Sequence, residues 1–75
     1  MNDGLAMLHL TLRQLEIFSA VAQSGSTVAA ADAVGLSQSA TSAALQQLEG
    51  ALNTLLFERV GRSVVLNDAG RALLP

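Results

Sequence analysis

One short polar stretch of this 75-residue chain carries the side chains best suited to recognising another molecule. Within "LSQSATSAALQQLE", residues 36–49, these are Gln38, Ser39, Thr41 and Ser42. A glutamine amide can bond to N6 and N7 of adenine in the major groove of DNA, and a serine hydroxyl can donate to phosphate. The same side chains could instead be ordinary surface residues of a helix. Thr41 lies at the edge of the apolar side on a helical wheel, which favours a place in the core.

The positive charge of the chain is concentrated in one other place. Of four arginines, Arg59 and Arg62 are three residues apart, whereas Arg13 and Arg71 are isolated. Affinity for DNA comes mostly from neutralising phosphates. Arg59 and Arg62 are therefore candidate contacts to the DNA backbone, the alternative being solvated charges. Arg13 and Arg71 are expected to be surface ion-pair partners.

The composition restricts the class of protein. The chain is 51% hydrophobic and 13% charged, which is too apolar for a disordered tail and fits one small domain. It has no apolar run of the roughly 18–20 residues needed to cross a membrane, and its start is a poor match to a signal peptide. We therefore expect a cytoplasmic protein without a membrane partner. The net charge of −2 by itself disfavours nucleic-acid binding.

An enzyme is not expected from the residues available for catalysis. His9 is the one histidine, and it is expected to be exposed to solvent. The chain has no cysteine, no glycine-rich phosphate loop and no close pair of carboxylates. A nucleophile needs a positioned base, and 75 residues are too few to enclose a usual substrate pocket. We expect no catalytic residue, no cofactor and no metal site.

The elements that position these residues follow from apolar spacing and from capping residues. Residues 1–10 lack periodicity and are predicted to be an N-terminal extension. Thr11 is the expected N-cap of a first helix that ends at Gly25. Ser26 caps a short second helix, Gly35 permits a turn, and Ser37 caps a third, amphipathic helix that ends at Asn53. The predicted core is Leu15, Phe18, Val21, Ala30, Val34, Leu36, Ala44, Leu45, Leu48, Leu52, Leu56, Phe57 and Leu66.

The pattern changes after the third helix. "LLFERV–GR–SVVLN" contains two short β-prone runs around a Gly-Arg turn, which predicts a hairpin. Asn67 then caps a last helical start. Helix, short helix, turn, helix and hairpin is the order of a winged helix-turn-helix, a mainly α fold. The predicted division is an extension over 1–10, the domain over 11–67 and the start of a linker helix over 68–75.

The chain resembles the N-terminal domain of LysR-type transcriptional regulators. The resemblance lies in "LRQLEIFSAVAQSGS", "AADAVGLSQSATSAALQQLE" and "LFERVGRSVVLNDAG", and it extends from Thr11 to Leu74. The combination of "GLSQ", "LE" and "LFER…GR…L…AG" is far more specific than a lone helix-turn-helix pattern. Molybdate-responsive regulators, which carry a related winged helix, are the nearest alternative family.

The resemblance implies sequence-specific binding to double-stranded DNA. The helix-turn-helix would extend from Thr27 to Gln46. The DNA-binding residues would be Gln38, Ser39, Thr41 and Ser42 at the start of the third helix, with Arg59 and Arg62 on the wing. The linker helix would pair two subunits into a homodimer or higher oligomer, and would lead to a C-terminal domain that binds a small-molecule effector.

Several residues depart from the pattern of the family. Family members commonly have an aromatic residue at position 27, a proline at 39 and a basic residue near 43, where this chain has Thr27, Ser39 and Ala43. They often have threonine and a basic residue at 28 and 29, where this chain has Val28 and Ala29. These differences remove charge and bulk from the side expected to face DNA. They bear on affinity and target sequence rather than on the fold. A winged helix that docks another protein through its uncharged third helix is the alternative function.

Overall fold

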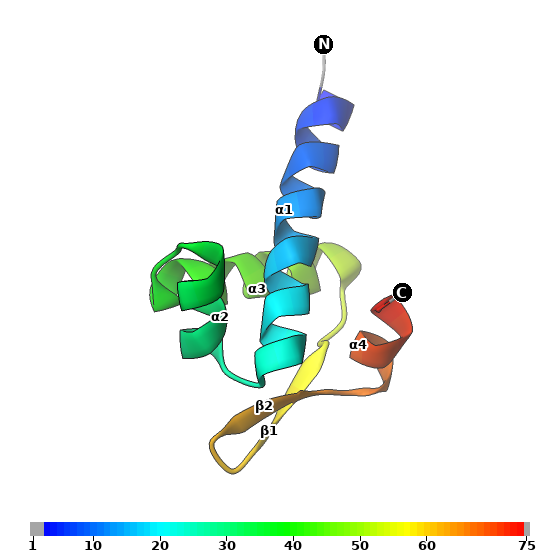
Figure 1. The fold of residues 1–75 in the computed structure, drawn as a ribbon. Helices are drawn as coiled ribbons and strands as arrows, with labels where there is room; N and C mark the ends of the chain where they lie inside the picture. The colour runs from blue at the N-terminus through cyan, green and yellow to red at the C-terminus, as the bar shows by residue number, and fades with distance from the viewer. Residues whose placement is uncertain (1–2, 75) are drawn as a thin grey trace.

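Three helices, a two-stranded wing and a short last helix make up the structure. The computed structural model describes the backbone of residues 3–74 and the side chains of residues 12–74. The elements in chain order are α1 (Asp3–Ser24), α2 (Thr27–Val34), α3 (Gln38–Leu52), β1 (Phe57–Val60), β2 (Ser63–Leu66) and α4 (Asp68–Leu73). Helix α1 contacts α2, α3 and β2, while the β1–β2 hairpin projects from the helical body as a wing (Figure 1). The predicted winged helix-turn-helix fold is confirmed.

Helix α1 begins earlier than expected. The prediction that Thr11 is its N-cap is wrong, because α1 starts at Asp3 and passes through residue 11 without a break. The preceding stretch is rich in leucine, alanine and methionine, which are strong helix formers even where their spacing gives no clear apolar stripe. The first half of α1 projects beyond the other helices (Figure 1). The side chain of His9 lies outside the described residues.

The other predicted helix boundaries are confirmed by the geometry of the caps. Ser26, Ser37 and Asn67 each accept a hydrogen bond from the backbone N–H three residues ahead, at 3.2, 3.0 and 2.8 Å. Helix α2 ends at Gly35 with φ 75°, and α3 ends at Asn53 with φ 55°. Both ends adopt the left-handed conformation in which a further backbone N–H reaches the last carbonyls of the helix.

The core lies where α1, α2 and α3 meet the base of the wing. Its buried cluster consists of Ile17, Phe18, Val21, Ala30, Leu45, Leu48 and Leu56. All of these except Ile17 were predicted, and six further predicted residues are partly buried against the cluster: Leu15, Val34, Leu36, Ala44, Phe57 and Leu66. Ile17 was missed because α1 is covered on more than one side, which widens its buried face.

The prediction that Leu52 belongs to the core is wrong. Its side chain is 44% exposed. Leu48 is the last buried residue of α3, Glu49 after it is half-buried, and residues 50–53 are exposed. The final turn of α3 therefore extends past the elements that cover the rest of the helix, so an apolar residue at the correct helical spacing remains in solvent.

The wing is tied to the helical body at three points. Strands β1 and β2 are antiparallel, and a two-residue turn with Gly61 at φ 62° joins them, as in a type II′ hairpin. The ring of Phe57 packs against that of Phe18 with centroids 5.4 Å apart. The N–H of Val64 donates to the carbonyl of Gly25 at 3.1 Å. The third point, at the carboxylate of Glu49, belongs to the interface described next.

Candidate nucleic-acid interface

The first turn of α3 presents polar side chains to solvent. Gln38 and Ser39 are exposed, and Ser42, one turn further along, is half-buried. Ser37 holds this end of the helix by accepting the N–H of Ala40. The first amide groups of a helix have no partner within it and carry the positive end of the helix dipole. This turn therefore combines hydrogen-bonding side chains with a local attraction for negative charge.

Thr41 does not belong to this exposed set. Its side chain is completely buried, and its hydroxyl donates to the carbonyl of Ser37 at 2.9 Å. Of the two roles predicted for Thr41, the place in the core is confirmed. The predicted contact with DNA is wrong for this conformation, because no atom of the side chain reaches the surface. Thr41 lies on the buried side of α3 together with Leu45 and Leu48.

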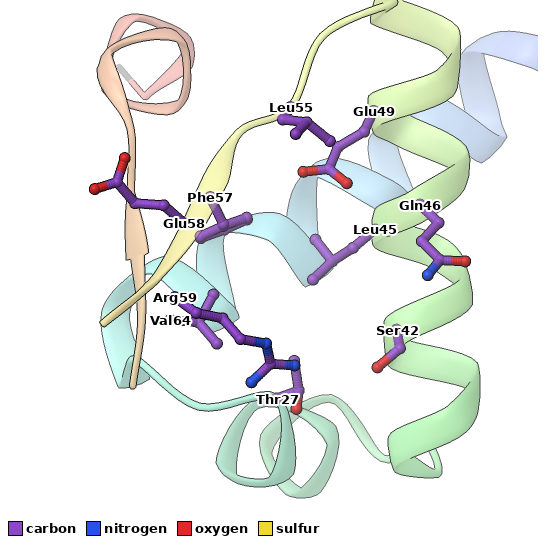
Figure 2. A pocket seen from close by; sticks show the side chains of 10 residues that line it. All are labelled: Thr27, Ser42, Leu45, Gln46, Glu49, Leu55, Phe57, Glu58, Arg59 and Val64. Carbon is purple, nitrogen blue, oxygen red and sulfur yellow. The ribbon is translucent and has the colours of Figure 1, made fainter. Parts of the chain in front are cut away.

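A cleft separates α3 from the wing. It has a volume of about 210 Å³ and is lined by Thr27, Ser42, Leu45, Gln46, Glu49, Leu55, Phe57, Glu58, Arg59 and Val64. Figure 2 shows the guanidinium of Arg59 extending from β1 across this cleft toward Thr27, with Ser42 on the facing side of α3. Of the predicted DNA-binding residues, Ser42 and Arg59 therefore open onto the same hollow, whereas Gln38, Ser39 and Arg62 do not line it.

The strand geometry explains why Arg59 and Arg62 lie in different places. Side chains two apart in a strand lie on the same face, so Arg59 shares the face of Phe57, which packs on the helical body. Arg62 lies in the turn after Gly61, at the tip of the wing, and is exposed. Among the described residues, neither Arg59 nor Arg62 forms an ion pair.

Arg13 and Arg71 are ion-pair partners, as predicted. Arg13 pairs with Glu16 at 3.1 Å and also donates to the carbonyl of Val34. Arg71 pairs with Asp68 and donates to the carbonyl of Leu66. These two arginines support their own helices and adjacent turns. Arg59 and Arg62 are left as the cations that the described structure offers to an external anion.

Glu49 is a structural link that the sequence did not reveal. Its Oε2 accepts the backbone N–H of Leu56 at 2.8 Å, which connects the last turn of α3 to the residue before the wing. Leu56 is 1% exposed, so its N–H would lose water without gaining another partner if Glu49 were absent. The residues are seven apart on different elements, and no local pattern signals such a bond.

Thr27 is a second residue whose contact was not foreseen. It is the first residue of α2, and its Oγ1 accepts a hydrogen bond from Nε2 of Gln38, the first residue of α3, at 3.4 Å. Thr27 is half-buried and lines the cleft beside Arg59. The amide of Gln38 is thus held to α2 on one side while the residue itself stays exposed.

In the described part of the chain, no group of three or more histidine, cysteine, aspartate or glutamate side chains is arranged to hold a metal ion. None of the described helices is both long and apolar enough to cross a membrane.

Similar proteins support the assignment of the fold and give it a family. The model of the bacterial regulatory helix-turn-helix proteins of the lysR family matches residues 12–71. The uncharacterized HTH-type transcriptional regulator YeiE of Escherichia coli K12 is 56% identical over 68 residues, covering 91% of this chain and 23% of YeiE. The RuBisCO operon transcriptional regulator of Allochromatium vinosum is 48% identical over 64 residues, covering 85% of this chain and 21% of that regulator.

Two solved structures of similar domains contain DNA. The CbnR_DBD–DNA complex aligns with a TM-score of 0.78 and 42% identity, covering 83% of this chain and 71% of that one. The BenM_DBD complex with benA site 1 DNA aligns with a TM-score of 0.78 and 36% identity, covering 81% of this chain and 71% of that one.

The matches cover most of this chain but only part of the longer relatives. The family model covers the helix-turn-helix and the wing, and ends within α4. The chain spans less than a quarter of the length of YeiE and of the Allochromatium regulator. The caps, the turn and the wing described above are those of the matched segment, and this chain belongs to the LysR family of bacterial regulatory helix-turn-helix proteins.

Proposed function

We propose that this domain binds double-stranded DNA in a sequence-specific manner and serves bacterial transcription control. The observation that carries the proposal is the cleft that α3 and the wing share, where the polar side of α3 faces Arg59. A recognition helix in the major groove beside a basic wing has this layout, because bases are read in the groove while phosphates flank it.

Each exposed residue has a distinct role in this proposal. Gln38, at the start of α3, reads a base edge in the major groove. Ser39 and Ser42 donate to phosphates or base edges near the same turn. Arg59 and Arg62 neutralise backbone phosphates at the edge and tip of the wing. Their freedom from ion pairs within the described structure supports this role, since no internal partner must be given up.

The similar structures support the proposal that this domain binds DNA. CbnR_DBD and BenM_DBD were each solved with DNA, and both share the fold of this chain at 36% identity or more. We propose that the protein acts in the cytoplasm as a homodimer or higher oligomer that contacts two half-sites about one helical turn apart, or a multiple of it. A linker helix that starts at α4 would pair the subunits, and a further domain would bind a small-molecule effector.

The salt dependence of DNA binding tests the proposal. The domain would be fused after Pro75 to a two-stranded coiled coil, since linked copies gain affinity without new contacts. Fluorescence anisotropy would then give the dissociation constant for duplex DNA at several salt concentrations. The logarithm of the affinity should fall with the logarithm of the salt concentration by about 0.9 for each phosphate neutralised. Sites selected from random duplexes would then give the base preference.

Matched arginine variants separate this function from the alternative. The double variant Arg59→Ala, Arg62→Ala should reduce the salt slope of the fused dimer by about four, or about two for each subunit, since each arginine is expected to neutralise one phosphate. Arg13→Ala removes an arginine that is already paired with Glu16, and should leave the slope unchanged. If the fused dimer shows no affinity for DNA even at low salt, the domain is instead a protein-interaction module.

A further inference from the structure

We propose that Thr27 is a specificity-determining residue that orients the amide of Gln38 toward adenine. The inference rests on the proposed function, because it concerns how one side chain of the same interface reads a base. Thr27 itself need not touch DNA in this scheme. It acts through its hydrogen bond to Gln38, so it is a positioning residue.

The two ends of this hydrogen bond are held by independent features. Thr27 follows the cap at Ser26, and Gln38 follows the cap at Ser37, so each is the first residue of a capped helix. The turn between these helices is closed by the N–H of Leu36, which donates to the carbonyl of Ala31 at 2.9 Å. The backbones on both sides of the Thr27–Gln38 bond are therefore fixed before any ligand arrives.

The side chains differ in how much freedom they bring to the bond. Threonine is branched at Cβ and has few rotamers, and Thr27 is also half-buried. Gln38 is exposed and has three side-chain torsions, so without a partner its amide would sample many directions. A side chain that is ordered on binding costs affinity, and a bond already present in the free protein reduces that cost.

The direction of the bond selects the base. Nε2 of Gln38 has two hydrogens, and one of them is directed at Oγ1 of Thr27. The second N–H and the carbonyl Oε1 remain available on the exposed side. Adenine presents an acceptor, N7, beside a donor, the N6 amino group, and this pair matches one N–H and one carbonyl. The reverse orientation, with Oε1 toward Thr27, would present two N–H groups, which suit the two acceptors of guanine.

The first test needs no DNA. Nuclear magnetic resonance of the free protein would record the side-chain amide signals of Gln38 in three proteins: the unaltered chain, Thr27→Val and Thr27→Ser. Valine keeps the branched shape of threonine but has no acceptor, whereas serine keeps the hydroxyl. The bond predicts shifted and more mobile Gln38 amide signals in Thr27→Val, with little change in Thr27→Ser. Unchanged amide signals in a folded Thr27→Val protein would overturn the inference.

The second test measures base preference in the fused dimer. At the position that Gln38→Ala identifies as its contact, Thr27→Val should lower the preference for adenine over the other bases by about two- to tenfold, the usual effect of one hydrogen bond. Affinity for random duplex DNA should stay unchanged. In a Gln38→Ala background, Thr27→Val should have no further effect on selectivity, since the two residues act as one unit.

The outcomes of these tests separate the role of Thr27 from the proposed DNA binding. Three results would each reject the role of Thr27 while DNA binding stands. Thr27→Val could keep the base selectivity of the unaltered domain, or the unaltered domain could prefer guanine at that position. Thr27→Val could also lose as much selectivity in the Gln38→Ala background as it does alone. Failure of the unaltered fused dimer to bind any DNA would instead reject the proposed function, and the free-protein spectra would still decide whether Thr27 holds Gln38.

Discussion

Helix α3 and the wing face the same cleft but are built in opposite ways. Helix α3 spans 15 residues, is capped at both ends, and buries Thr41, Leu45 and Leu48. It has no lysine or arginine. The wing has four residues in each strand, most of its side chains are exposed, and it carries Arg59 and Arg62. Helix α3 is well packed but carries little charge, whereas the wing carries positive charge but buries little surface.

This contrast separates two properties that a DNA reader needs. Base discrimination depends on hydrogen bonds placed to within a few tenths of an ångström, which requires a rigid element. Affinity depends mainly on charge near phosphates, which tolerates looser placement. We infer that α3 supplies most of the discrimination and the wing most of the affinity. The negative net charge of the chain is compatible with this division, because the two arginines that form no ion pair within the described structure both lie on the wing.

The largest expected effect is the loss of unfolding free energy when the buried side of α3 is altered. Leu48→Ala removes a side chain that is 2% exposed, and should lower the free energy of unfolding by about 2–5 kcal/mol. Leu55→Ala, in the loop between α3 and the wing, removes a leucine that is 67% exposed, and should change the free energy of unfolding by less than about 0.5 kcal/mol. Urea unfolding followed by circular dichroism measures both. Similar losses for the two variants would contradict the contrast between the packed side of α3 and the exposed leucine beside the wing.

The next effect concerns the bond that joins the two regions. Glu49→Ala leaves the buried N–H of Leu56 without its acceptor, and should cost about 1–3 kcal/mol of unfolding free energy. Glu49→Gln keeps an oxygen of nearly the same position and should cost less. Urea titration of the variants beside the unaltered chain gives the difference. If alanine and glutamine are equally tolerated, the link between α3 and the wing does not depend on this hydrogen bond.

A variant in α3 should affect discrimination. Gln38→Ala should weaken binding to the selected site by about 1–3 kcal/mol and relax the base preference at one position. Affinity for random DNA should change little, because Gln38 carries no charge. Anisotropy titrations of the fused dimer on selected and random duplexes provide the comparison. An equal loss on both duplexes would show that Gln38 does not read a base.

A variant in the wing should lower the affinity for all DNA without changing the base preference, and its effect should be the smallest. Arg62→Ala should weaken binding to selected and random duplexes alike and lower the salt slope by about one for each subunit, or about two for the fused dimer. The same titrations, repeated over a range of salt concentrations, give the slope. A slope that matches the unaltered domain would mean that Arg62 does not contact phosphate, and would leave Arg59 as the charged part of the wing.

The features predicted correctly from sequence are those fixed by short-range chemistry. Ser26, Ser37 and Asn67 cap helices through bonds to residues three positions away, so the residue type and its place before an apolar pattern suffice. Gly35 and Asn53 end helices because they tolerate the left-handed conformation. Thr11 was misassigned because a capping residue type does not act as a cap where the helix formers before it continue the helix.

The features that were missed depend on contacts between elements. The exposure of Leu52 and the burial of Ile17 depend on which neighbours cover each helix, and periodicity alone does not show this. The bonds that Leu56 donates to Glu49 and that Gln38 donates to Thr27 join residues from separate parts of the fold. The family resemblance pointed to the start of α3 as a whole, and only the packing separated buried Thr41 from exposed Gln38 and Ser39.

The hydrogen bond from Val64 to the carbonyl of Gly25 has a consequence for the kind of DNA this domain would accept. Gly25 directly precedes Ser26, the cap of α2, so the bond ties the middle of the wing to the start of the helix-turn-helix. Together with the Phe18–Phe57 contact, it holds the separation between the first turn of α3 and Arg59 nearly constant. A duplex must then bring its groove and its flanking phosphates to that separation. Sequences that bend or narrow at low cost would be favoured, even at base pairs that no side chain touches.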